Sequence, residues 1–125
     1  MGDIRSMNKC HFLGEMVRDP MLRCLNKSNG NTVDCVNFSL LVSRRFKKKS
    51  GDHGVQKTFL DFEAWDEGAR VISESFNKGD WISVYASAKT DSYLDNNNNK
   101  VTKVKFRVND FEFVSFNEKE NTTIA

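Results

Sequence analysis

Apolar and polar residues alternate along most of the chain, and a period of two predicts β-strands. The alternation is clear over residues 36–42 and again over residues 82–88. Helical spacing of apolar residues occurs only in one short segment, residues 66–79. The pattern therefore predicts an all-β protein that contains a single short helix.

Five strands are expected, and the helix separates the third strand from the fourth. The strands are predicted at residues 8–14, 36–42, 59–65, 82–88 and 103–108. This order of elements is that of the oligonucleotide-binding barrel, or OB-fold. The strand count alone leaves small sandwiches and SH3-like barrels open as alternatives.

Several local signals mark the ends and irregularities of these elements. Asp66 is the expected N-cap of the helix and Gly79 its C-terminal stop. Val33 and Cys35 fall out of phase with the second strand, which suggests a bulge there. The fifth strand changes phase before Phe111. We expect an exposed loop at residues 47–54 and a turn at residues 95–99.

The chain of 125 residues is 38% hydrophobic and has one proline, a composition typical of one compact domain. No segment approaches the about 20 apolar residues that span a bilayer, and the N-terminus lacks the apolar core of a signal peptide. We divide the chain into a possible leader at residues 1–6, an OB-fold domain at residues 7–114 and a flexible tail at residues 115–125.

Residues suited to catalysis or metal binding are few. His11 and His53 are the only histidines, and neither belongs to a motif that suggests a catalytic triad. Cys24, Cys35 and His53 match none of the usual zinc spacings. Together with Cys10, these cysteines are expected to be reduced residues in or near the core. The sequence predicts neither an enzyme, nor a cofactor, nor a metal site.

Positive charge is concentrated in one segment although the chain as a whole is nearly neutral. Nineteen basic and 17 acidic residues leave a formal charge of +2, whereas residues 44–49 contain five cations in six positions. A local basic patch points to a polyanion bound at one place. Charge alone does not distinguish this hypothesis from a solvated loop kept soluble by lysines.

Aromatic rings lie among cations at positions that the strand period turns outward. Phe59 and Trp65 share the polar face of the expected third strand, and Tyr93 lies on the same side as Lys89. Phe46 stands within the basic segment. Unpaired bases stack on such rings while cations neutralise phosphates, so this surface suits single-stranded nucleic acid. The alternative is that Trp65 covers the helix start and Phe59 a barrel edge.

Four segments together resemble a known family. Residues 7–14 read Met-Asn-Lys-Cys-His-Phe-Leu-Gly, and residues 18–23 read Arg-Asp-Pro-Met-Leu-Arg. Residues 58–62 read Thr-Phe-Leu-Asp-Phe, and residues 76–80 read Phe-Asn-Lys-Gly-Asp. The chain resembles the bacterial-type single-stranded DNA-binding protein (SSB) family over residues 7–113.

The resemblance implies roles for individual residues. Bases are expected to stack on Phe46, Phe59, Trp65 and Tyr93. Phosphates are expected to contact Arg5, Arg23, Arg44, Arg45, Lys47, Lys48, Lys49, Lys78, Lys89, Lys103 and Lys105. The resemblance also implies a homotetramer, with the hairpin of residues 89–105 wrapping DNA. The residues expected at the subunit interfaces are Lys9, His11, Trp81 and Tyr85.

The chain departs from the family pattern in two ways. Asp61 stands where many members have a basic or polar residue, and Asp66 and Glu67 replace a Gly-Lys pair. A Gly/Pro/Gln-rich linker and an acidic tip ending in Pro-Phe are also missing, so partners among replication and repair proteins stay uncertain. This pattern suggests a short phage- or organelle-like form, or a chain truncated at Ala125.

The function expected from the sequence is to coat single-stranded DNA, without strong sequence preference, in replication, recombination and repair. We expect a location in the cytoplasm of a bacterial or phage-infected cell, associated with the nucleoid, with an organelle matrix as an alternative, and no membrane partner. The alternatives are a primosome-like or RNA-binding OB-fold protein and a structural oligomerisation module.

Overall fold

The computed structural model describes residues 5–115, so most of the predicted leader and tail lie outside the described residues. Its elements are β1 (Cys10–Met16), β2 (Met21–Asn26), β3 (Thr32–Lys47), β4 (His53–Trp65), α1 (Asp66–Ser75), β5 (Trp81–Leu94) and β6 (Lys100–Val114).

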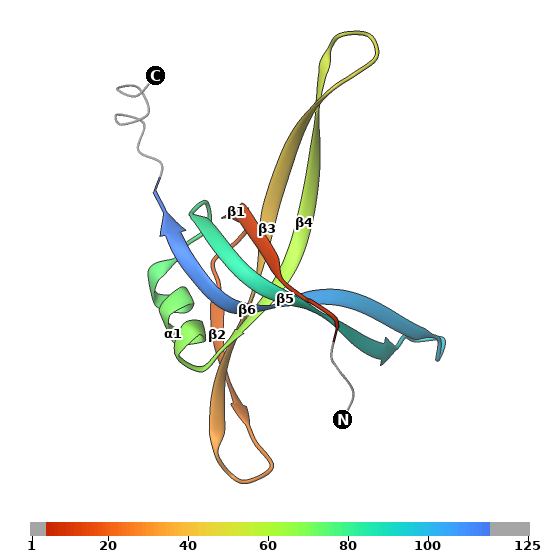
Figure 1. Ribbon diagram of the computed structural model, residues 1–125. Coiled ribbons are helices and arrows are strands. Elements are labelled where there is room, and N and C mark those ends of the chain that lie inside the picture. Colours follow the sequence, from red (N-terminus) through yellow and green to blue (C-terminus); the bar gives the residue numbers. More distant parts are fainter. Residues whose placement is uncertain (1–4, 116–125) are drawn as a thin grey trace.

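Five of the strands form a closed barrel, which confirms the predicted OB-fold (Figure 1). The strands are hydrogen-bonded in the order β1-β5-β6-β4-β3, and β1 returns to pair with β3. Two of these contacts are short: β1 meets β3 at Glu15 and Met16, and β4 runs parallel to β6 at Phe62 and Glu63. The helix lies between the third and fourth barrel strands, as predicted.

Strand β2 was not predicted from the sequence. Among residues 5–115 it pairs with β3 alone, along the whole of Met21–Asn26, and all six of its residues are exposed. An edge strand without a buried face leaves no apolar alternation in the sequence, because its pairing rests on backbone hydrogen bonds. The short segment of residues 17–20 joins β1 to this strand.

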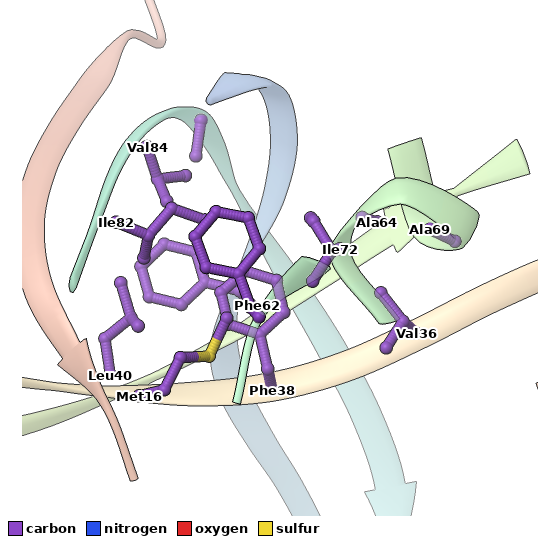
Figure 2. Close-up of a cluster of buried hydrophobic side chains, with 12 residues drawn as sticks. Met16, Val36, Phe38, Leu40, Phe62, Ala64, Ala69, Ile72, Ile82 and Val84 are labelled. Atoms are coloured by element: carbon purple, nitrogen blue, oxygen red, sulfur yellow. The ribbon is translucent and has the colours of Figure 1, made fainter. Parts of the chain in front are cut away.

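The core fills the barrel and continues under the helix (Figure 2). Phe62 is fully buried, and its ring stacks on Phe38 at a centroid distance of 5.2 Å. Phe12 meets the same ring edge-on at 5.7 Å. Gly14 is required where β1 crosses β3, because a Cβ atom there would lie 2.9 Å from the Leu41 carbonyl oxygen. The close crossing of the two strands closes this side of the barrel.

The helix has the predicted buried face but different ends. Ala69, Ile72 and Phe76 are buried, as their spacing indicated. The N-cap is Trp65 rather than Asp66, and no side chain caps the helix. The last helical residue is Ser75, and Gly79 lies in the following turn with a φ of 92°. Gly79 therefore shapes the approach to β5 instead of ending the helix.

The bulge predicted in the second barrel strand is absent, whereas the phase change predicted in the last strand is present. No bulge occurs at Val33 or Cys35, since β3 pairs in continuous register with β2 and β4. The phase change in the last strand is a real register shift: Tyr85 pairs with Asp110, whereas Ala86 pairs with Val108. The predicted turn at residues 95–99 is confirmed between β5 and β6.

The β3–β4 hairpin and the β5–β6 hairpin extend beyond the barrel, and the hairpin of β2 and β3 projects on another side (Figure 1). Within residues 5–115 no helix is long and apolar enough to cross a membrane.

Cys24 is exposed on β2, contrary to the expectation of a core position, while Cys35 is buried and Cys10 is partly buried. Burial raises the pKa of the Cys35 thiol, which keeps it protonated.

Candidate nucleic-acid interface

The four predicted stacking residues all come from the β3–β4 and β5–β6 hairpins or their bases. Phe59 on β4 is 62% exposed, Tyr93 on β5 is 47% exposed and Phe46 on β3 is 38% exposed. Trp65 ends β4 and is partly buried. Within the described chain none of the four packs against another aromatic ring. Three of the rings are therefore open to a planar ligand.

Phe46 lies in β3, and the exposed loop predicted at residues 47–54 is limited to residues 48–52. Strand β3 continues to Lys47, where it pairs with His53 at the start of β4. The Phe46 ring lies across the hairpin over Gly54, since a Cβ atom on that glycine would be 2.5 Å from the ring. The register also places Phe46 and Phe59 on opposite faces of the ladder, so the structure does not gather all four rings on one face.

Trp65 is held by a charged pair of neighbours. Its indole N–H donates a hydrogen bond of 2.5 Å to Glu63 Oε2, and the Arg107 guanidinium lies 5.4 Å from the ring centroid. Trp65 is also the N-cap residue directly before α1, which begins at Asp66. One face of this ring is thus occupied by a cation, and its orientation is fixed by a carboxylate.

Glu63 is a buried carboxylate, 3% exposed, at the centre of three cations. The Lys89 ammonium lies 2.8 Å from Glu63, the Arg107 guanidinium 3.4 Å and the Lys105 ammonium 3.9 Å. Burial acts to raise the pKa of Glu63, but hydrogen bonds from Lys89 and Trp65 outweigh it and the pKa lies below its ordinary value. Glu63 in turn raises the pKa of Lys89. Lys89 therefore stays charged, and the three cations are held around Glu63 on the outer face of the barrel.

The lowered pKa of Glu63 predicts a specific loss of stability in acid. A group whose pKa is lowered by folding stabilises the fold above its unfolded pKa, about 4.3 for glutamate, and loses that contribution as the pH falls through the folded pKa. We expect the free energy of unfolding to fall more steeply below about pH 4.3 in the unmodified protein than in Glu63→Gln. Urea denaturation at a series of pH values measures both slopes, and parallel curves would contradict the proposed network.

The basic segment forms the distal arm of the β3–β4 hairpin. Arg44, Arg45 and Lys47 are strand residues, and Lys48 and Lys49 lie in the turn that follows. Arg44 donates a hydrogen bond of 3.1 Å to Gln56 across the hairpin. All five side chains are exposed, so this arm presents its positive charge to solvent.

The other predicted cations occupy several elements. Arg23 on β2 pairs with Cys35 on β3, and Cys35 pairs with Trp65 on β4. The three residues therefore lie in one row across neighbouring strands, and this row links Arg23 to the interface. Lys103 lies 5.7 Å from the centroid of the Tyr93 ring. Lys78 belongs to the turn after α1, where its backbone N–H donates to Asp19. Arg5 precedes β1 and is exposed.

Sequence reasoning missed three members of this surface. Arg107 contacts both Trp65 and Glu63, and Arg18 and Asn37 line a cavity beside Tyr93. Arg107 follows Lys103 and Lys105 at intervals of two, and this period was the signal that could have included it. Arg18 and Asn37 reach the site through the closure of the barrel, which leaves no local pattern.

The residues expected at subunit interfaces lie on the outer face of β1 and β5. His11 stacks on Tyr85 with a centroid distance of 4.0 Å, and its Nε2 atom is 2.7 Å from the Ser83 hydroxyl. Lys9 is exposed just before β1, and Trp81 is partly buried. No group of side chains in residues 5–115 has the composition of a metal site.

Comparison with known proteins places this geometry in a family. The profile of the Single-strand binding protein family matches residues 7–114. The chain belongs to the single-strand binding protein family. Single-stranded DNA-binding protein 1 of Synechocystis sp. is 31% identical over 110 residues, which cover 87% of this chain and 84% of that protein. The resemblance seen in the sequence motifs is thereby confirmed.

Other members and a solved structure match over shorter parts of their own length. Single-stranded DNA-binding protein 2 of Clostridium acetobutylicum is 32% identical over 70% of this chain and 61% of that protein. A crystal structure of a deletion mutant of the single-stranded DNA binding protein from Thermus aquaticus superposes with a TM-score of 0.72 at 16% identity, covering 87% of this chain and 51% of that one. At this identity the structural match supports the fold.

Proposed function

We propose that this family member binds and coats single-stranded DNA in replication, recombination and repair, without catalysing a reaction. The observation that carries the proposal is the exposure of Phe59 and Tyr93 on an OB-fold barrel, with the Lys103 ammonium 5.7 Å from the centroid of the Tyr93 ring. Duplex DNA hides the faces of its bases, whereas a single strand presents them to such rings.

Two physical terms contribute to binding in this account. Stacking on Phe46, Phe59, Trp65 and Tyr93 provides a term that persists at high salt, worth about 1–3 kcal/mol per base. The cations of the β3–β4 arm, such as Lys49, release counterions from phosphates, and the logarithm of affinity then falls with the logarithm of salt concentration by about 0.7 per phosphate.

The proposed assembly is a homotetramer in the cytoplasm, with β1 and β5 supplying contacts between subunits. Support comes from His11 and Tyr85, which pair across β1 and β5 and stack on each other, and from Trp81, which pairs with Glu15 further along the same two strands. The interface on β1 and β5 leaves the rings of the two hairpins available to DNA. The β5–β6 hairpin, residues 89–105 in particular, is proposed to extend along the bound strand.

A titration with a mixed-sequence single-stranded oligonucleotide tests the function. We expect the fluorescence of Trp65 to be quenched with a stoichiometric break, and gel filtration of the free protein to give the mass of a tetramer. Equal affinity for the matching RNA strand would favour the primosome-like or RNA-binding alternative. An oligomer that binds neither strand would favour the structural module.

A further inference from the structure

Glu63 is an acidic side chain within a surface that is proposed to bind a polyanion. Its side chain is 4% exposed, whereas the surrounding side chains of Lys105, Lys89 and Arg107 are 25%, 36% and 54% exposed. Solvent therefore reaches the cations but scarcely reaches the carboxylate, and the cations outnumber it. A phosphate that approaches this part of the barrel meets positive charge first, so Glu63 is poorly placed to repel DNA.

The two oxygens of Glu63 serve different partners. Oε2 accepts a hydrogen bond of 2.5 Å from the indole N–H of Trp65 and lies 3.4 Å from Arg107 Nε, and the Arg107 guanidinium lies 5.4 Å from the centroid of the indole ring. Oε1 lies 2.8 Å from the Lys89 ammonium and 3.9 Å from that of Lys105. One carboxylate thus connects an aromatic ring on β4 with three cations on β5 and β6.

These contacts hold long side chains in place before any ligand is present. A free lysine or arginine side chain samples many rotamers, and immobilising one on binding costs about a 2- to 12-fold loss of affinity. Lys89 and Arg107 are already immobilised by Glu63 in the free protein. Their loss of conformational freedom occurs on folding, so it does not weaken the binding of a ligand that uses them.

We propose that Glu63 is a positioning residue for single-stranded DNA and that this acidic side chain raises the affinity for a polyanion. The inference rests on the proposed function, to which it adds the residue that orders one part of the surface. A base meets the Trp65 ring in a fixed orientation, and phosphates meet Lys89 and Arg107 at fixed positions. Net charge alone predicts the opposite effect, because removing a carboxylate near bound phosphates reduces repulsion.

The test compares dissociation constants for oligo-dT at one salt concentration and neutral pH. Glu63→Gln keeps the shape of the side chain and removes its charge, and we expect it to weaken binding about tenfold because two cations lose their fixed positions. Asp61→Asn is the matched control: Asp61 is exposed on the same face of β4, and its carboxylate accepts a hydrogen bond from the Ser39 hydroxyl instead of from a cation. It removes the same charge and should bind oligo-dT as tightly as the unmodified protein or more tightly.

Arg107→Lys keeps the test decisive if Glu63→Gln destabilises the fold. The Arg107 side chain is exposed, so this change should leave folding intact, and lysine keeps the charge without the planar guanidinium that meets both Trp65 and Glu63. We expect about 2- to 12-fold weaker binding. In a Trp81→Phe background, where Trp65 is the one tryptophan, acrylamide should quench the fluorescence of the free protein more strongly after Glu63→Gln.

Urea denaturation of each variant shows whether it is folded under the conditions of the binding assay. Tighter or unchanged binding by folded Glu63→Gln, or unchanged binding by Arg107→Lys, would overturn the inference and leave the proposed function intact. An equal loss of affinity in Asp61→Asn and Glu63→Gln would also overturn it, because the loss would then not depend on the cations. Failure of the unmodified protein to bind oligo-dT would overturn both.

Discussion

Replacing Phe62 with alanine should lower the free energy of unfolding by about 3–5 kcal/mol, the usual cost of removing a buried phenylalanine side chain. The Phe62 ring is fully buried and lies 5.2 Å from Phe38 and 5.4 Å from Phe106, measured between centroids. Phe38 and Phe106 lie on β3 and β6, the two strands that flank β4, so removing the Phe62 ring would leave a cavity inside the barrel core. Urea denaturation at one fixed protein concentration measures the change.

The same strand supplies the matched control. Phe59 lies three residues earlier on β4, on the opposite face, and is 62% exposed. Phe59→Ala should change the free energy of unfolding by no more than about 0.5 kcal/mol, because exposed substitutions remove little buried surface. A large destabilisation by Phe59→Ala would show that this ring is covered in the assembled protein and is not available to DNA.

The second large effect concerns the binding of single-stranded DNA. Here Phe59, the control for stability, is the residue whose removal is expected to have the effect. Phe59→Ala and Tyr93→Ala should each weaken single-stranded DNA binding by about 5- to 150-fold, the equivalent of about 1–3 kcal/mol of stacking. The loss should be equal at low and high salt, since stacking releases no counterions. Binding isotherms at several salt concentrations provide the measurement.

Lys49→Ala is the control for the electrostatic term. This lysine lies in the exposed turn of the β3–β4 hairpin, away from Glu63 and its cations. Its removal should flatten the salt dependence by about 0.7 in logarithmic slope for the phosphate it contacts. If the ring variants and Lys49→Ala changed the slope equally, the division between stacking and charge would be wrong.

The alternation of apolar residues was sufficient to predict the barrel because each strand buries one face. Val36, Phe38 and Leu40 are buried as their period of two indicated, and Ala69 and Ile72 confirm the face of the helix. Strand β2 escaped prediction because it buries neither face. Apolar and polar residues alternate only where a strand buries one of its faces, so a strand held by its edge alone shows no alternation in the sequence.

The candidate site was predictable in its residue types but not in its arrangement. Glu63 shares the face of its strand with Phe59 and Trp65, which the alternation turned outward, yet the structure buries it among Lys89, Lys105 and Arg107. Those contacts depend on the parallel pairing of β4 with β6, which joins residues more than forty positions apart. Barrel closure also brings Asn37 and Asp61 to one cavity. Long-range register of this kind has no signature in a local window of sequence.

The most direct test of the account is the affinity for a single strand compared with that for the duplex of the same sequence at equal salt. Because exposed rings need unpaired bases, the account predicts that the single strand binds at least about a hundredfold more tightly, the equivalent of one or two stacked bases. The difference should persist as the salt concentration rises. Equal affinity for the two forms, lost together at high salt, would show that binding is electrostatic alone and would contradict the proposal.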